Sequence, residues 1–266
     1  MNIQVCKNYA LYLRLPYLRH NLEALIHEAK TNDINYEEFI ELILERECNT
    51  RSCESIKRRI KQAKFSYPMR ECDYKLDGFS HEVAHEIKEL FTLDFLKEQS
   101  NIILVGNPGV GKTALSIALG MKVCEQEKNV MFVNVSDLII SIKEAMSLHQ
   151  INLYKRKFIS QDLVIIDDLG YSSFDKNAAE VLFHLLSSRM GKGSTIITTN
   201  LLFDRWHEIF NDEALTGAIV DRISYKSHVV NMCGDSYRVK ETINWLKRGE
   251  NDEIADVLHS SGSIFN

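Results

Sequence analysis

Hydrophobic residues recur at two different spacings along this chain of 266 residues. Before residue 65 they lie three and four positions apart, as in Leu18, Leu22 and Leu25 and again around Leu42. This spacing gathers them on one face of a helix. Between the two stretches, residues 35 and 38 are Asn and Glu, the pattern of a capping box at a helix start. We therefore predict a small helical domain at the N-terminus.

From residue 101 onward, short apolar runs alternate with helical spacing. The five runs are 101–105, 130–134, 163–166, 194–198 and 228–232, and the segments with helical spacing are 113–125, 137–148 and 178–189. Such alternation predicts an α/β fold, a parallel sheet with helices on both faces.

Residues 65–80 separate the two regions, lose any periodicity and contain Pro68 and Gly78, which favours a linker. We expect a helical domain over 1–66 that binds DNA or a partner, and a linker with a first core helix over 67–98. The α/β core is expected over 99–244, followed by a polar tail over 245–266.

Composition narrows the class of protein. Hydrophobic residues make up 45% of the chain, which is normal for a globular protein. No apolar run reaches the roughly 20 residues of a membrane helix, and the first residues lack the apolar core of a signal peptide. We expect a cytoplasmic protein.

The net charge of −5 argues against a protein that binds nucleic acid through a uniformly basic surface, but local basic patches remain possible. None of the six cysteines forms a C-x-x-C pair, so we expect no zinc or redox motif.

The segment GNPGVGKT follows the first apolar run and matches the phosphate-binding pattern G-x-x-x-x-G-K-[ST] in full. A chance glycine-rich turn is the alternative, but the strand before and the helix after favour a nucleotide site. Lys112 is expected to reach the β- and γ-phosphates of ATP, and Thr113 to bind Mg²⁺. The residues assigned to nucleotide binding are Gly106, Asn107, Pro108, Gly109, Val110, Gly111, Lys112, Thr113 and Ala114.

A second motif, LVIIDDLG, places two acids at the end of the third run. Ligands of open α/β sheets bind at the carboxyl ends of strands. We expect Asp167 to hold Mg²⁺ through water and Asp168 to polarise the attacking water. A solvated turn is the alternative, which the upstream phosphate loop disfavours. Asn200 ends the fourth run and is a candidate to hold the same water, although an Asn there also suits a turn.

Several blocks in order resemble the IstB-type helper ATPases of bacterial insertion sequences, which belong to the AAA+ superfamily and are close to DnaC-type helicase loaders. The blocks are GNPGVGKTALSIALG, LVIIDDLGY, GSTIITTNLLFDRW, IFND and VDRISYKSHVVNMCGDSYRVKE, preceded by LRLPYLRHNLEALIHEAKTNDINYEEFIELILERE and RRIKQAKF. The resemblance covers nearly the whole chain, up to about Glu241.

The resemblance implies an AAA+ P-loop NTPase core whose five parallel strands follow the order 5-1-4-3-2, with a small helical N-terminal domain. It also implies a homo-oligomer, a ring or spiral that forms with ATP, binds double-stranded DNA and works with a separate cognate transposase. The motifs assign sensor 1 to Asn200 and the arginine finger to Arg222, which reaches a neighbouring subunit. A surface arginine is the alternative for Arg222. Arg238 is a candidate for sensor 2.

One position departs from the common AAA+ pattern. Many of these proteins carry Asp-Glu at the strand end, whereas the second acid here is Asp168, one methylene shorter. We expect slow hydrolysis, stimulated by DNA.

Two basic clusters are candidates for DNA contact, with Phe65, Tyr67, Tyr154 and Phe158 close by. Solvated helix faces are the alternative for such runs. Contacts of this kind would be sequence-independent and sensitive to salt. The residues are Lys57, Arg58, Arg59, Lys61 and Lys64 in the first cluster and Lys155, Arg156 and Lys157 in the second.

Three functions remain open at this point. The leading one is a transposition helper ATPase, and the second is a loader of a replicative helicase. The third is a scaffold that binds ATP and barely hydrolyses it, which the shorter acid at Asp168 motivates. No acid pair besides Asp167 and Asp168 is well placed, so we predict that the chain does not cut DNA.

Overall fold

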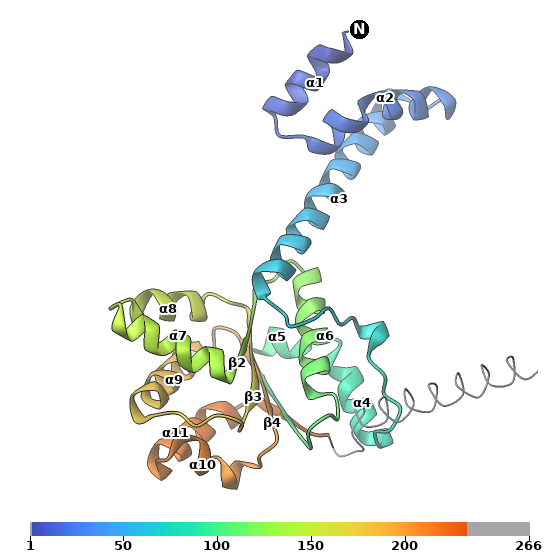
Figure 1. The fold of residues 1–266 in the computed structure, drawn as a ribbon. Coiled ribbons are helices and arrows are strands. Elements are labelled where there is room, and N and C mark those ends of the chain that lie inside the picture. The colour runs from blue at the N-terminus through green and yellow to red at the C-terminus, as the bar shows by residue number, and fades with distance from the viewer. Residues whose placement is uncertain (1, 233–266) are drawn as a thin grey trace, which may run out of the picture. The chain divides into compact units, whose positions relative to one another are not determined.

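The computed structural model describes residues 2–232, which fall into two compact units that divide between Lys61 and Gln62 (Figure 1). The helical domain was expected to end at residue 66, a few residues into the second unit. The expected boundary at residue 244, the polar tail and the sensor 2 candidate Arg238 lie outside the described residues.

The first unit consists of helices. They are α1 (Ile3–Tyr12), α2 (Pro16–Thr31) and the part of α3 (Tyr36–Ala63) that precedes the division. Asn35 and Glu38 bracket the start of α3 as predicted. The Asn35 Oδ1 accepts from the Glu38 N–H at 2.9 Å, and the Glu38 Oε2 accepts from the Asn35 N–H at 3.1 Å. Each side chain thus satisfies a backbone donor that the helix leaves unpaired.

A buried carboxylate joins α2 to α3. Leu15 precedes α2 and offers no side-chain cap, but the Glu47 Oε2 on α3 accepts from the N–H groups of Tyr17 at 3.0 Å and Leu18 at 3.2 Å. Glu47 is only 4% exposed. Its negative charge also lies at the positive end of the α2 dipole, where an anion is stabilising. The cap of α2 is therefore supplied from a residue far along the chain, which local sequence signals do not reveal.

The second unit is an α/β fold. Its helices are α4 (His81–Leu90), α5 (Asp94–Glu98), α6 (Lys112–Glu125), α7 (Val135–Ser147), α8 (Ile151–Ile159), α9 (Lys176–Arg189), α10 (His207–Phe210) and α11 (Glu213–Ser224), with short 3-10 turns η1 (Glu71–Asp73) and η2 (Phe203–Arg205). Its strands are β1 (Asn101–Val105), β2 (Val130–Asn134), β3 (Leu163–Leu169), β4 (Ser194–Thr199) and β5 (Ser227–Asn231).

All five strands are parallel, in the order β2-β3-β4-β1-β5. This is the predicted order 5-1-4-3-2 read from the other edge, so the fold prediction is confirmed. Helices α4 to α6 lie on one side of the sheet and α7 to α11 on the other (Figure 1). Every residue of β4 is buried, as a strand covered on both faces requires.

Two helices begin slightly before their predicted starts because a cap precedes each of them. The Asn134 Oδ1 accepts from the Ser136 N–H at 2.9 Å before α7, and the Asp175 Oδ1 accepts from the Ala178 N–H at 3.0 Å before α9. Asn and Asp are favoured at this position. Within residues 2–232, no helix has the length and apolar character needed to cross a bilayer.

We predict that Glu47→Ala destabilises the first unit by about 2 kcal/mol, because two N–H groups of α2 lose a charged acceptor. Urea unfolding followed by far-UV circular dichroism measures the effect. Glu45→Ala is the control, since Glu45 is exposed on the same helix. Equal unfolding midpoints for the two variants would contradict the role given to Glu47.

Candidate functional site

The phosphate loop joins the end of β1 to the start of α6. The Gly106 N–H donates to the Thr199 carbonyl at 3.2 Å, which holds the beginning of the loop against the end of β4. Gly111 closes the loop with φ of 98°, in the left-handed region that glycine adopts without strain. The loop thus ends at the N-terminus of α6, where free N–H groups and the helix dipole favour phosphate.

Lys112 and Thr113 begin α6 and turn toward different partners. Lys112 is 7% exposed, and its Nζ donates to the carbonyls of Gly106 at 2.7 Å and Asn107 at 2.9 Å. The Thr113 hydroxyl donates to the Asp167 Oδ1 at 3.0 Å. The two motifs predicted from the sequence therefore meet at one place, at the carboxyl edge of the sheet.

Asp167 is the buried acid of the pair. It is 3% exposed, and its Oδ1 also accepts from the Thr198 hydroxyl at 2.7 Å. Burial raises the pKa of Asp167, and the hydroxyls of Thr198 and Thr113 oppose that rise. A hydroxyl and a carboxylate at 3.0 Å are oxygen ligands of the kind that Mg²⁺ takes beside phosphate and water.

The ladder between β3 and β4 is interrupted at Asp168. The register shifts between Ile166 and Leu169, and Asp168 has φ of 62°. Its N–H donates to the Thr198 Oγ1 at 2.8 Å. Thr198 therefore contacts both acids, through its hydroxyl hydrogen to Asp167 and through its oxygen to Asp168. Bulges of this kind re-aim side chains next to functional sites.

Sequence reasoning missed Thr198 and also Asn134, whose Nδ2 lies 3.5 Å from the Asp168 Oδ2. A signal was present for both residues. They lie at or near the carboxyl ends of β4 and β2, the two strands that flank β3. Parallel strands bring these ends to one edge of the sheet. Once the strand order is known, polar residues at these ends become candidates for the site.

Asn200 follows β4 and packs against the turn that follows the acid pair. A Cβ atom on Gly170 would lie only 2.4 Å from the Asn200 Oδ1, and Gly170 has φ of 122°. The Asn200 Oδ1 is buried and has no hydrogen-bond partner among the described residues. The predicted residue is therefore brought to the same edge of the sheet as Asp167 and Asp168.

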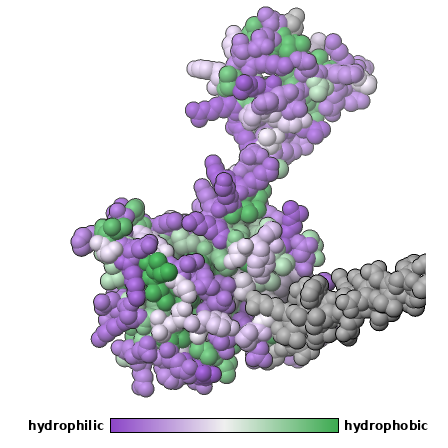
Figure 2. Space-filling view, in the orientation of Figure 1, coloured by the Kyte–Doolittle hydropathy of each residue, from purple (hydrophilic) through white to green (hydrophobic). Residues whose placement is uncertain are grey.

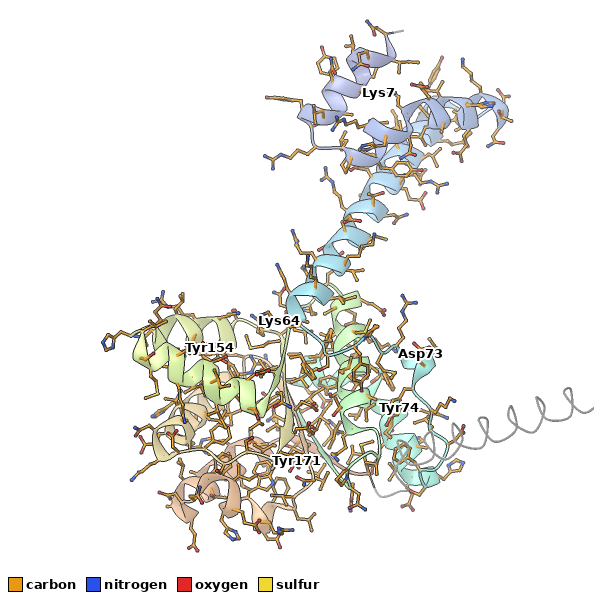
Figure 3. The ribbon with its side chains drawn as sticks, in the orientation of Figure 1. Lys7, Lys64, Asp73, Tyr74, Tyr154 and Tyr171 are labelled. Atoms are coloured by element: carbon orange, nitrogen blue, oxygen red, sulfur yellow. The ribbon has the colours of Figure 1, made fainter. Side chains whose placement is uncertain are left out.

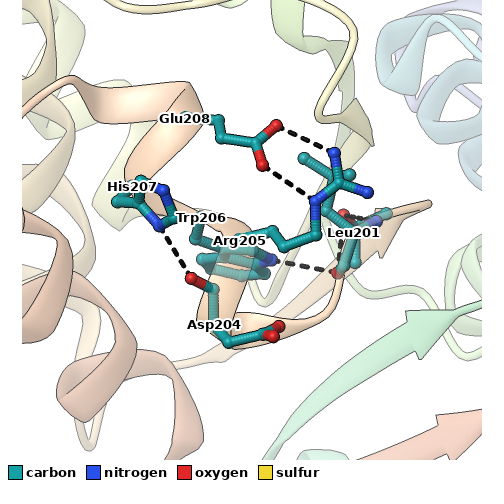
Figure 4. A network of polar contacts seen from close by, with 7 residues as sticks. Leu201, Asp204, Arg205, Trp206, His207 and Glu208 are labelled. Carbon is teal, nitrogen blue, oxygen red and sulfur yellow. Dashed lines mark hydrogen bonds and ion pairs between the residues drawn. The ribbon is translucent and has the colours of Figure 1, made fainter.

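The backbone after Asn200 is held by a buried tryptophan. The Trp206 Nε1–H donates to the Leu201 carbonyl at 3.2 Å, and the Leu201 N–H donates to the Thr199 Oγ1 at 3.1 Å (Figure 4). On the outer side, Arg205 and Glu208 form an ion pair at 2.8 Å. These contacts fix the chain on the C-terminal side of Asn200.

Arg222 lies near the amino ends of the strands, whereas the phosphate loop and the acid pair lie at their carboxyl ends. It occupies the last turn of α11, where its NH1 pairs with the Asp221 Oδ2 at 2.6 Å. The carbonyl of the next residue, Ile223, accepts from the Asn101 Nδ2 at the start of β1, whereas the phosphate loop follows the end of β1. A strand of five residues spans about 17 Å. The structure does not bring Arg222 to the phosphate loop of its own chain.

The predicted DNA-contacting residues lie on helix surfaces. Lys57, Arg58, Arg59 and Lys61 are on α3, and Lys64 follows α3 in the second unit. Two of them have local partners: the Lys57 Nζ pairs with Glu54 at 2.9 Å, and the Arg59 NH1 donates to the Ser55 Oγ at 3.1 Å. Lys155, Arg156 and Lys157 are on α8.

Two of the neighbouring aromatic residues pack against side chains of the protein itself. Phe158 is completely buried beneath the Arg189 guanidinium, 5.6 Å from its ring centre, and Phe65 packs edge-on against Phe132 at 6.0 Å. The exposed apolar residues beside the second cluster are aliphatic instead. Leu148 and Leu153 are both 64% exposed. Hydrophobic residues lie among hydrophilic ones on the side of the α/β unit where Figure 1 labels α7 and α8 (Figure 2).

A phosphate loop on β1, an acid pair on β3 and a parallel sheet of this order define an AAA+ P-loop ATP-binding protein. A family model described as "IstB-like ATP binding protein" matches residues 9–244. The chain belongs to this IstB-like ATP-binding family, which confirms the resemblance.

Two relatives are similar along most of their length. The "Insertion sequence IS21 putative ATP-binding protein" of Pseudomonas aeruginosa is 33% identical over 232 residues, which cover 86% of each chain. The "Insertion sequence IS5376 putative ATP-binding protein" of Geobacillus stearothermophilus is 32% identical over 233 residues, covering 88% of this chain and 93% of the relative.

Solved structures share the fold at lower identity. DnaA from Aquifex aeolicus bound to AMPPCP has a TM-score of 0.55 at 16% identity, covering 70% of this chain and 56% of that one. A DnaI crystal structure has a TM-score of 0.52 at 20% identity, covering 63% of this chain and 89% of that one.

Asp167→Asn should stabilise the protein at neutral pH when nucleotide and Mg²⁺ are absent. The folded-state pKa of Asp167 is raised, so the wild type loses stability as pH rises through that pKa, whereas Asn stays neutral. We expect a melting temperature higher by ~2–4 °C at pH 7, which corresponds to about 1 kcal/mol, and a smaller gap at pH 4.5. Differential scanning calorimetry measures both. Asp77→Asn, at an exposed acid, is the control, and a less stable Asp167→Asn at pH 7 would contradict the prediction.

Proposed function

We propose that this protein is an ATP-dependent helper of DNA transposition, which assembles on double-stranded DNA and recruits or stimulates a separate transposase. The observation that carries the proposal is the junction of Thr113 with Asp167, a nucleotide site in a chain whose relatives are ATP-binding proteins of insertion sequences. The fold supports ATP use, and the relatives supply the biological context.

The proposed hydrolysis uses residues that meet at the carboxyl edge of the sheet. Thr113 and Asp167 would hold Mg²⁺, which neutralises phosphate charge when bound. Lys112 would leave its loop carbonyls to contact the β- and γ-phosphates. Asp168 would accept a proton from the attacking water, and Asn200 would orient that water through its unpartnered Oδ1.

The same geometry supports slow turnover. Asp168 is one methylene shorter than Glu and its backbone is tied to Thr198, so the carboxylate has a short reach. We infer that DNA stimulates this slow reaction. Phosphate release measured with DNA tests both points, with Lys112→Ala as the control. No release above the Lys112→Ala level would favour the scaffold that barely hydrolyses ATP.

Arg222 is proposed as a finger that acts on the nucleotide of a neighbouring copy. Its place at the amino edge of the sheet supports this proposal, because one chain cannot present both the loop and the finger to a single nucleotide. A guanidinium in that role stabilises charge in the transition state. The active form would then be a homo-oligomer, a ring or spiral that ATP holds together.

Arg222→Ala should reduce ATP hydrolysis on the order of 10³-fold, because the transition state loses its charge partner. Mixing is the sharper measurement. Lys112→Ala keeps the finger and Arg222→Ala keeps the loop, so an equal mixture should regain activity that neither variant has alone. A mixture as inactive as its components would contradict a shared site.

The basic residues of α8 are proposed to contact DNA phosphates. The logarithm of the DNA association constant falls linearly with the logarithm of salt concentration, and each phosphate contact adds about 0.9 to the steepness of that fall. Replacing Arg156 and Lys157 together with Ala should therefore make the slope less steep by about 1.8. Fluorescence anisotropy with duplex DNA over a range of salt concentrations measures the slope. Lys192→Ala, at an exposed lysine of the same unit, should leave it unchanged. An unchanged slope in the double variant would place the DNA elsewhere.

The identity of the protein that this chain binds distinguishes a transposition helper from a helicase loader. With ATP and duplex DNA present, the immobilised full chain should retain a cognate transposase. Retention of a replicative helicase and no transposase would reverse the proposal in favour of the loader.

A further inference from the structure

The segment between α3 and α4 lies along helix α6. Phe65 packs so closely on Gly120 that a Cβ atom there would come within 2.8 Å of the Phe65 ring. Further on, the Met69 N–H donates to the Met121 Sδ at 3.2 Å, and Glu71 pairs with Lys122 at 2.5 Å. This part of the predicted linker is therefore fastened to the helix that carries the phosphate loop.

The fastened segment ends at Tyr74, whose side chain reaches the phosphate loop. A Cβ atom on Gly111 would lie 3.3 Å from the Tyr74 hydroxyl oxygen and 3.6 Å from its ring. Figure 3 shows Tyr74 beside α6, next to Asp73 of η1. Gly111 immediately precedes Lys112. The phenol thus lies directly against the last residue of the loop.

The Tyr74 hydroxyl is buried and has no hydrogen-bond partner among the described residues. Burial raises the pKa of Tyr74, so the phenol keeps its proton and remains a hydrogen-bond donor. A buried hydroxyl without an acceptor costs free energy, and most such groups in proteins are satisfied. A tyrosine that served only to pack would do so equally well as phenylalanine.

We propose that Tyr74 is a nucleotide-binding residue whose hydroxyl donates a hydrogen bond to ATP held in the phosphate loop. The acceptor is an oxygen or nitrogen atom of the nucleotide, on its phosphate chain or on its nucleoside. The inference rests on the ATP site of the proposed function and on none of its partners. It makes Tyr74, at the end of the segment fastened to α6, part of the nucleotide site.

The test uses the full chain and calorimetric titration with Mg²⁺–ATP. Tyr74→Phe removes only the hydroxyl, so we expect ATP affinity to fall about tenfold, which is within the range for the loss of one hydrogen bond. Without nucleotide, the melting temperature of Tyr74→Phe should equal or exceed that of the wild type, because the variant no longer buries an unsatisfied donor. Tyr36→Phe, at a tyrosine that is 91% exposed, is the matched control for both measurements.

A second titration with tripolyphosphate locates the acceptor. A loss of affinity for both ligands assigns it to the phosphate chain, and a loss for ATP alone assigns it to the nucleoside. Wild-type or tighter binding of ATP by Tyr74→Phe, while Lys112→Ala fails to bind, would overturn the proposal. Failure to retain a transposase would count against the transposition helper and leave these affinities untouched.

Discussion

The buried carboxylate of Asp167 is the constraint around which the phosphate loop and the acid pair are arranged. It accepts hydroxyls from Thr113 on α6 and Thr198 on β4, so one side chain joins the helix of the phosphate loop to two central strands. Burying that charge is costly unless it is hydrogen-bonded, and both hydroxyls serve this purpose. The position of Asp168 follows from the same junction, because Thr198 also accepts from its backbone N–H.

The groups proposed to act on ATP lie at two different ends of the parallel strands. The phosphate loop, the acid pair and Asn200 all lie at the carboxyl edge, whereas Arg222 lies near the amino edge beside the start of β1. In the proposed oligomer, this separation makes ATP a link between copies. Tyr74 would tie the segment between α3 and α4 to the bound nucleotide.

The parts of this protein that local sequence patterns predicted are those governed by local physics. Glycines and a lysine at fixed spacing after a buried run specify a phosphate loop, and apolar runs covered on both faces specify parallel strands. The Asn35–Glu38 capping box is likewise complete within four consecutive residues. In each case the interacting groups are close in the chain, so their spacing carries the information.

Contacts between distant residues were decided only by the tertiary structure. Glu47 caps a helix that begins about thirty positions earlier, and Thr198 completes a site around an acid on another strand. Phe158 resembled a stacking residue beside a basic run, but α8 turns it into the core. The sequence by itself determined the ATP-binding class and the strand order through its family motifs. Packing decided which side chains surround the phosphate loop and the acid pair, because burial and hydrogen bonding depend on neighbours that spacing along the chain does not encode.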